Sequence, residues 1–291
     1  MFKGVYTALV TPFNEDGSID EGALRKLVDV QIQGGVNGLV PMGTTGESPT
    51  VDHDENIQVI EIVVDQAKKR VPIIAGTGSN STEEAVRMTR RAKDCGADAT
   101  LQVAPYYNKP NQEGFYRHFM EVADKGGLPV IVYNIPGRTG KNIENSTTLR
   151  LARHSEIVAV KEASGDLNQV MDIIAQKPEG FDVLSGDDNL IYPFMALGAA
   201  GVISVASNLI PDQMSAFLNQ LLAGKYQDAL KTHYRLLPLF KAMFIDTNPI
   251  PIKAALAMTG SIKEVYRLPM CSLSIENKQK LQGVLKEFAI L

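Results

Sequence analysis

A lysine that closes a short apolar run is the residue of this chain with the clearest chemical potential. Lys161 follows Ile157-Val158-Ala159-Val160, which has the composition of a buried strand. Burial disfavours the ammonium form and lowers the pKa, and the resulting neutral amine attacks carbonyl carbons. The placement therefore predicts a lysine that forms a Schiff base. The alternative for Lys161 taken alone is a strand end whose amine reaches solvent.

A second buried run ends in the same way. Tyr133 closes Pro129-Val130-Ile131-Val132, and a phenol at that place is a candidate proton donor. Lys161 and Tyr133 thus close two successive predicted strands. This repetition makes it less plausible that each is merely a strand end whose polar group reaches solvent.

Two further segments carry groups that bind anions. The segment Met42–Ser48 holds two glycines and the hydroxyls of Thr44 and Thr45, a composition that can form an anion-binding concavity. Arg138 lies in the turn after Tyr133, where a guanidinium can hold a carboxylate through two hydrogen bonds. An ordinary glycine-rich turn and a surface arginine remain the alternatives for each segment in isolation.

Other chemistries find less support. The segment Gly76-Thr77-Gly78 lacks the third glycine of a dinucleotide fingerprint, so NAD is not expected. Asp187 and Asp188 follow a predicted strand where a barrel would bind phosphate, which favours a carboxylate substrate over a phosphorylated sugar. No metal site is expected, because the histidines have no ligand spacing and most of them are predicted at the surface: His53, His118, His154 and His233.

Composition limits the class of protein. The chain has 291 residues, 44% of them hydrophobic and 21% charged, with a net charge of −4, as in a soluble globular protein. There is no basic stripe for nucleic acid and no apolar run long enough to span a membrane. Cys95 and Cys271 form no paired motif and are typical of reduced thiols in a cytoplasmic protein.

Apolar runs alternate with amphipathic helical patterns along most of the chain. Continuous Val/Ile/Ala strands indicate a parallel sheet covered on both faces, and eight such units predict an α/β fold of the (β/α)8 TIM barrel type. A doubly wound sheet is the alternative. The expected strands are Gly4–Leu9, Gly38–Pro41, Pro72–Ala75, Ala99–Val103, Pro129–Tyr133, Ile157–Lys161, Asp182–Leu184 and Gly201–Val205. The expected barrel helices are Glu21–Gln33, Asp54–Lys68, Thr82–Cys95, Asn111–Lys125, Ser146–Arg153, Leu167–Gln176, Asn189–Leu197 and Pro211–Leu222.

The pattern changes to helices alone near residue 225. The expected helices are Tyr226–Met243, Ile250–Thr259 and Ile275–Phe288. We therefore expect residues 1–224 to form a catalytic barrel and residues 225–291 to form a C-terminal helical region packed on it.

Three motifs resemble those of the pyruvate-dependent lyase and synthase family, and within it the dihydrodipicolinate synthases. They are GLVPMGTTGE at 38–47, YNIPGRT at 133–139 and VKEASGD at 160–166. The resemblance runs through the whole chain. Arg138 separates this chain from the N-acetylneuraminate lyases of the same family, which lack arginine there.

The resemblance implies a division of roles in imine chemistry. Lys161 would condense with pyruvate, and Thr45 would hold the pyruvate carboxylate. Tyr133 would move protons, linked through the Thr44 hydroxyl to Tyr107, which in this family enters from the neighbouring subunit.

The second substrate and the product are implied in the same way. Arg138 would receive the carboxylate of L-aspartate-4-semialdehyde, and Gly186 and the Ile203 carbonyl would line the pocket. The reaction would be a step of diaminopimelate and lysine synthesis, without a cofactor. A related sugar-acid aldolase, for N-acetylneuraminate or a 2-keto-3-deoxy acid, is the second hypothesis. A pyruvate-responsive binding protein without catalysis is the third.

The family also implies assembly and feedback control. Its members are commonly homotetramers, built as dimers of dimers, with L-lysine bound at the tight interface. The matching positions are Ser48, His53, Asn80, Glu84 and Tyr106. Asn56 stands where lysine-sensitive relatives often carry histidine, and Pro49 replaces an alanine. Interface packing is the alternative role for these residues, and it remains open.

Overall fold

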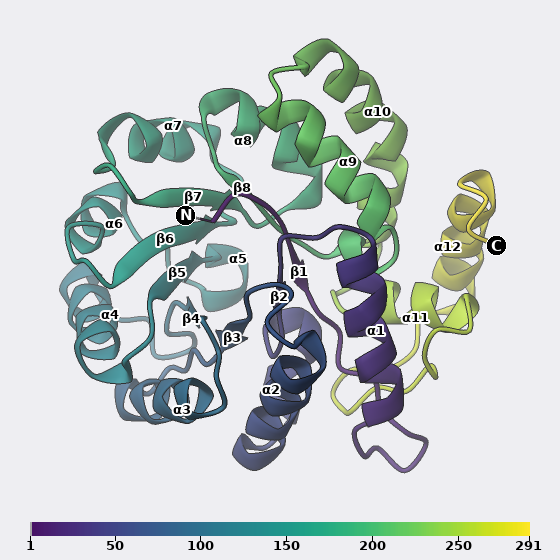
Figure 1. Cartoon of the computed structure of the whole chain (residues 1–291), viewed down its shortest axis with the longest axis horizontal. Coiled ribbons are helices and arrows are strands. Elements are labelled where there is room, and N and C mark those ends of the chain that lie inside the picture. Colours follow the sequence, from purple (N-terminus) through teal and green to yellow (C-terminus); the bar gives the residue numbers. More distant parts are fainter. Residues whose placement is uncertain (1) are drawn as a thin grey trace.

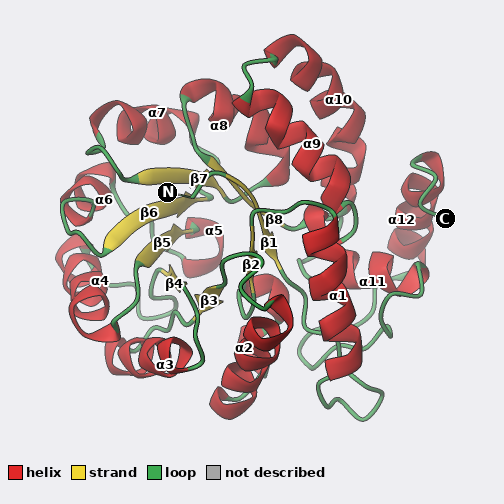
Figure 2. Cartoon of the chain, in the orientation of Figure 1, coloured by secondary structure: helices red, strands yellow, loops and turns green. Residues whose placement is uncertain are grey.

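Eight parallel strands form the centre of the molecule, and helices surround them (Figures 1 and 2). The structure is a computed structural model and describes residues 2–291. The strands are β1 Gly4–Ala8, β2 Gly38–Val40, β3 Ile74–Gly76, β4 Ala99–Val103, β5 Val130–Asn134, β6 Ile157–Glu162, β7 Asp182–Ser185 and β8 Gly201–Ser204.

The strands follow one another around a barrel. Hydrogen-bonded neighbours run in the order β2-β1-β8-β7-β6-β5-β4-β3. A parallel bridge between Leu39 and Ile73 joins β2 to β3, and the Gly76 N–H donates to the Pro41 carbonyl at 2.9 Å. These contacts close the ring, so the predicted (β/α)8 TIM barrel is confirmed.

Helices cover the outside of the barrel and continue beyond it. The barrel helices are α1 Glu21–Gln33, α2 His53–Ala67, α3 Thr82–Asp94, α4 Gln112–Gly126, α5 Pro136–Thr139, α6 Asn145–Leu151, α7 Leu167–Gln176, α8 Ile191–Leu197 and α9 Pro211–Leu222. The later helices are α10 Tyr226–Ala242, α11 Ile250–Met258 and α12 Ile275–Glu287. Each predicted element is present, with ends within about two residues of the expected ones. The short helix α5 was not predicted.

Local capping fixes several of the helix starts. Asp52 accepts hydrogen bonds from the backbone N–H groups of Asp54 and Glu55, and the Glu55 side chain accepts one from the Asp52 backbone. This reciprocal capping box satisfies donors that the first turn of α2 leaves free. Asp166 caps α7 in a simpler way, directly after the loop that follows Lys161.

The alternation of side chains along β5 and β6 separates two environments. Ile131, Tyr133 and Ala159 belong to the cluster inside the barrel, whereas Val132 and Val160 pack against the outer helices. Because successive side chains of a strand point to opposite faces, the side chain of Lys161 points to the interior like that of Ala159.

The C-terminal helices share a core with one side of the barrel. Leu236 of α10, Ile252 of α11 and Leu281 of α12 belong to the same cluster of buried side chains as Leu9 and Met42. In Figure 1 these helices lie beside α1 and α9. The region that follows the barrel therefore reaches the loop after β2.

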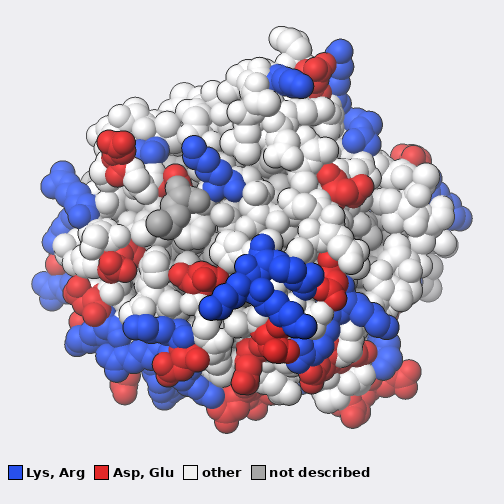
Figure 3. All heavy atoms as spheres, in the orientation of Figure 1, with Lys and Arg blue, Asp and Glu red and all other residues white. Residues whose placement is uncertain are grey.

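The surface carries charged side chains of both signs, which mix on the face shown in Figure 3. Within residues 2–291, no helix combines the length and the apolar character that a membrane span requires.

The expectation that most histidines lie at the surface was wrong, because His118 and His233 are buried. His118 lies on the face of α4 that carries Phe115 and Phe119.

Candidate active site

Lys161 lies near the carboxyl end of β6, inside the barrel. Its side chain is 6% exposed, and burial lowers the pKa of the amine from 10.5 to about 8. The carboxylates of Asp187 and Asp188 act in the opposite direction. An amine with this pKa is neutral in a useful fraction of molecules near neutral pH, as a nucleophile that forms imines requires.

Tyr133 is the direct neighbour of Lys161 on the adjacent strand. The two residues are paired in the register of β5 and β6, and the Lys161 Nζ lies 4.1 Å from the centre of the Tyr133 ring. Burial raises the pKa of the phenol, while Arg138 and a hydrogen bond with the Thr44 side chain favour the phenolate. The phenol therefore stays protonated next to the amine, as a proton donor must.

The loop after β2 brings two threonines to the same end of the barrel. Thr44–Gly46 form a short 3-10 helix, and Thr45 is 2% exposed. Thr11, in the loop that follows β1, holds this turn by donating its hydroxyl hydrogen to the Gly46 carbonyl at 2.7 Å. Glu47 ends the turn in the left-handed region, at φ 57°. The predicted glycine-rich loop is therefore a fixed turn.

A buried ion pair anchors this loop to the C-terminal region. The Glu47 carboxylate binds the Lys253 ammonium of α11, and both side chains are at most 1% exposed. The Lys253 Nζ also lies 4.3 Å from the centre of the Phe13 ring, and the Arg267 backbone N–H donates to Glu47 Oε2 at 3.3 Å. This pair was not predicted from the sequence, although a lysine inside the apolar run of α11 was a signal for it.

The loop after β7 approaches Lys161 closely. A Cβ atom at Gly186 would lie 3.2 Å from Lys161 Cε and 2.6 Å from Ala163 Cβ, so glycine leaves the space that the lysine chain uses. Burial raises the pKa of the adjacent Asp187 to about 6. Ile203 of β8 belongs to the interior cluster.

Two buried carboxylates support the strand ends around Lys161. Glu162 points outward from β6 and accepts hydrogen bonds from Asn134 Nδ2, Gln169 Nε2 and the Ser164 N–H at 2.7–3.2 Å. Asp188 accepts from the N–H groups of Val205 and Ala206 at 3.1 and 2.8 Å. These donors pair with Glu162 and with one oxygen of Asp188, whose buried Oδ1 has no hydrogen-bond partner within residues 2–291.

Arg138 lies on the short helix α5, directly after β5. Its Nη2 donates to the Asn248 carbonyl at 3.1 Å. The other N–H groups of the guanidinium stay available, because arginine carries five donors. A carboxylate at this place can therefore bind without displacing the existing contact.

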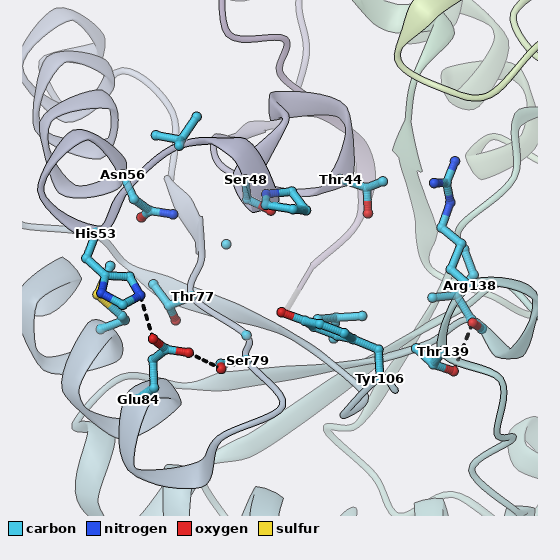
Figure 4. Close-up of a pocket in the computed structure, with 17 residues that line it drawn as sticks. Thr44, Ser48, His53, Asn56, Thr77, Ser79, Glu84, Tyr106, Arg138 and Thr139 are labelled. Carbon is cyan, nitrogen blue, oxygen red and sulfur yellow. Dashed lines mark hydrogen bonds and ion pairs between the residues drawn. The ribbon is translucent and has the colours of Figure 1, made fainter. Parts of the chain in front are cut away.

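A cavity of about 360 Å³ runs from Arg138 to the N-terminal turn of α2 (Figure 4). Thr44 and Arg138 line one end of it, and His53 and Glu84 line the other. His53 Nε2 lies 2.5 Å from Glu84 Oε1. Ser48, Pro49, Asn56 and Tyr106 also line the cavity.

Seven of the expected site residues are not among those that line this cavity: Lys161, Tyr133, Thr45, Tyr107, Gly186, Ile203 and Asn80. The Nδ2 of Asn80 donates to the Tyr106 carbonyl at 3.2 Å. Tyr107 has a positive φ of 70° and is 89% exposed, so its ring lies in solvent in the single chain. Among residues 2–291, no hydrogen bond joins Tyr107 to Thr44.

The structure therefore brings most of the predicted chemistry to one end of the barrel. Lys161, Tyr133, Thr44, Thr45 and Arg138 come from the carboxyl ends of three strands, where barrel enzymes place their sites. No cluster of three potential metal ligands occurs within residues 2–291. The fold and this site define a barrel enzyme of the type that acts through a lysine imine.

Comparison with known proteins gives the family. The model of the Dihydrodipicolinate synthetase family matches residues 1–288, and the chain belongs to this family. Curated 4-hydroxy-tetrahydrodipicolinate synthases of Thermodesulfovibrio yellowstonii and Geotalea daltonii are 53% and 52% identical over 291 residues, with complete coverage of both chains.

Solved structures of the family superpose closely on this chain. The dihydrodipicolinate synthase of Acinetobacter baumannii, solved with pyruvate, is 43% identical with a TM-score of 0.98 and complete coverage of both chains. The enzyme of Cyanidioschyzon merolae, solved with lysine bound, is 39% identical with a TM-score of 0.97. That match covers 100% of this chain and 99% of the other.

Proposed function

We propose that this chain condenses pyruvate with L-aspartate-4-semialdehyde and releases 4-hydroxy-tetrahydrodipicolinate, in the diaminopimelate route to lysine. The observation that carries the proposal is the amine of Lys161, with its pKa lowered to about 8 beside the Tyr133 phenol. Relatives at about 50% identity over the whole chain are named for this product.

The covalent steps use Lys161 and Tyr133. The neutral amine adds to the C2 carbonyl of pyruvate and expels water, which leaves an imine. Loss of a proton from the pyruvate methyl group gives an enamine, whose carbon attacks the aldehyde. Tyr133 moves protons in these steps through its hydrogen bond with Thr44. The amino group of the second substrate then attacks the imine carbon, closes the ring and releases Lys161.

Two groups at the barrel mouth bind the substrate carboxylates. Thr45, in the turn after β2, holds the carboxylate of pyruvate. Arg138 receives that of the semialdehyde through its free N–H groups. Gly186 and the Ile203 carbonyl border the space around Lys161.

Borohydride reduction with pyruvate tests the covalent step. Reduction of the imine is expected to add the pyruvate carbon skeleton to the peptide that contains Lys161, as mass mapping detects. Lys161→Arg keeps the charge and removes the nucleophile, so this variant is expected to trap nothing. A wild-type protein without an adduct on Lys161 would end the proposed mechanism.

A related sugar-acid aldolase is the second candidate, because the imine chemistry would be the same. Arg138 favours the semialdehyde, since it offers a carboxylate site at the mouth. Cleavage of N-acetylneuraminate or a 2-keto-3-deoxy acid at a rate comparable with the condensation would favour the aldolase. A binding protein without catalysis is disfavoured, because it has no use for Tyr133 beside an amine.

The active assembly is proposed to be a homotetramer built from two tight dimers. Tyr107 supports the proposal, because its exposed ring and left-handed backbone project from the chain. In the dimer, this tyrosine would enter the neighbouring site and extend the relay of Thr44 and Tyr133.

Feedback inhibition by L-lysine is proposed at the far end of the cavity. Glu84 supplies a carboxylate for an ammonium group, with His53, Ser48 and Tyr106 around it and Asn80 bound to Tyr106. The buried Oδ1 of Asn56 has no partner within residues 2–291 and can accept a further hydrogen bond. Initial rates at increasing lysine test this site, and flat activity into the millimolar range would remove it.

Two broader expectations belong to the same proposal. The enzyme is placed in the cytoplasm, in keeping with the free thiols of Cys95 and Cys271. Residues 1–224 are proposed to act as the catalytic barrel, and residues 225–291 as a helical region that supports its mouth.

A further inference from the structure

One residue of the C-terminal region touches both groups that are proposed to bind carboxylates. Asn248 Nδ2 donates to Thr45 Oγ1 at 3.1 Å, and the Asn248 carbonyl accepts from Arg138 Nη2 at 3.1 Å. Thr45 follows β2, Arg138 follows β5, and Asn248 precedes α11. Three segments that are distant in sequence therefore meet at this residue.

The side chain of Asn248 is buried, although packing at this position does not require a polar amide. It is 5% exposed, and its Oδ1 is buried without a partner in the described part of the chain. Leaving a buried acceptor unpaired costs stability, which an apolar side chain of similar size would avoid. The only hydrogen bond that the side chain makes within residues 2–291 goes to Thr45.

The direction of this hydrogen bond matters for Thr45. A hydroxyl has one proton to donate and two lone pairs to accept with. Because the Asn248 amide donates to Oγ1, the proton of Thr45 stays free for an anion. A hydroxyl that accepts one hydrogen bond also becomes a better donor of its own.

We infer that Asn248 is a positioning residue for substrate carboxylates: its amide orients the Thr45 hydroxyl toward pyruvate, and its carbonyl orients the Arg138 guanidinium. This inference rests on the proposed roles of Thr45 and Arg138. The two links use different parts of Asn248, one the side chain and the other the backbone. Side-chain substitutions therefore separate them.

Steady-state kinetics of Asn248 variants test the inference. Asn248→Ala is expected to raise the KM for pyruvate roughly 3- to 10-fold, the effect of one lost hydrogen bond. The KM for the semialdehyde is expected to change less than 2-fold on the same ground, because the carbonyl contact with Arg138 remains. Asn248→Asp keeps the shape but accepts from Thr45, so it is expected to raise the KM for pyruvate further.

A double-mutant cycle shows whether Asn248 acts through Thr45. Thr45→Val removes the hydroxyl, and in that background Asn248→Ala is expected to leave the KM for pyruvate unchanged. Additive effects of the two substitutions would overturn the inference. So would an Asn248→Ala protein whose melting temperature falls while its KM for pyruvate stays at the wild-type value.

A matched control and a separate assay keep the outcomes distinct. Asn277→Ala removes an amide of the same region that donates to the Ile245 carbonyl at 3.4 Å, far along the chain from Thr45, and it is expected to leave both KM values unchanged. Borohydride trapping of the wild type on Lys161 tests the proposed function. If trapping succeeds and Asn248→Ala has a normal KM for pyruvate, only the positioning role fails.

Discussion

Lys161 and Tyr133 face each other across adjacent strands, with the lysine Nζ 4.1 Å from the centre of the tyrosine ring. The register of β5 and β6 sets this relationship. Both side chains point inward for the same reason, because they occupy the same phase of the pleat. An amine and a phenol are thus brought together by backbone hydrogen bonding alone, before any substrate arrives.

Removal of the phenol hydroxyl is expected to slow turnover without unfolding the protein. Tyr133→Phe keeps the ring against Lys161 and removes the proton donor, so kcat should fall by roughly 10²–10⁴-fold, the usual contribution of a positioned acid or base. Initial-rate assays and thermal melting measure both effects. A variant with near-normal kcat would contradict the relay.

The pH dependence of imine formation reports on Lys161. Its pKa is lowered to about 8, so the neutral amine is scarce well below pH 8, and the trapping rate should rise with pH and level off above it. Asp187 raises the pKa of Lys161, so Asp187→Asn should move the midpoint to lower pH. A midpoint near 10.5 in the wild type would contradict the burial of the amine.

Mixed subunits test the proposed crossing of Tyr107. Tyr107→Phe and Tyr133→Phe proteins are each expected to have low activity. When the two are dissociated and reassembled together, a mixed dimer contains one site with both tyrosines if Tyr107 crosses the interface. Activity should then rise above that of either variant. No recovery in verified mixed dimers would place Tyr107 in its own chain's site or outside the mechanism.

The buried ion pair of Glu47 and Lys253 is expected to matter for stability. Lys253→Met leaves the Glu47 carboxylate buried without its partner, which typically costs about 3–5 kcal/mol in the free energy of unfolding. Denaturant unfolding measures this loss. The exposed pair of Lys280 and Glu276 provides the control, and Lys280→Met should leave the denaturant midpoint nearly unchanged, because exposed ion pairs contribute little. Equal losses would show that burial of the first pair is unimportant.

Substitution of Arg138 separates the two substrates. Arg138→Ala is expected to raise the KM for the semialdehyde by roughly 10- to 100-fold, as loss of a charge-assisted hydrogen-bonded contact predicts. Trapping with pyruvate alone should stay close to the wild-type rate. An equal loss in both assays would argue against a role confined to the second substrate.

Local pattern was sufficient to predict the barrel and the residues at its strand ends. Apolar runs gave β5 and β6, and the polar residues that close them lie in the interior as expected. The burial of His118 could also have been predicted from the helical spacing of apolar residues. Its spacing from Phe115 and Phe119 places it on the buried face of α4.

Contacts between residues that are distant in the sequence could not be predicted from local patterns. Glu47 and Lys253 are 206 residues apart, and a glutamate in a glycine-rich turn normally lies in solvent. Asn248 precedes Pro249, and locally this dipeptide indicates only a helix boundary. Helix α5 spans four residues, too few for a helical period to appear. Each of these features depends on the closed fold, which the local sequence does not encode.

The dependence of the β2 loop on α11 also sets an order of events during synthesis. A chain leaving the ribosome presents every strand of the barrel before Asn248 and Lys253 emerge. Its reactive amine and phenol can already be in register, while the turn that carries Thr44 and Thr45 still lacks the contacts of the finished molecule. The mouth of the site can therefore be completed only after every barrel strand has been made, and a product terminated before Asn248 would retain the strands without it.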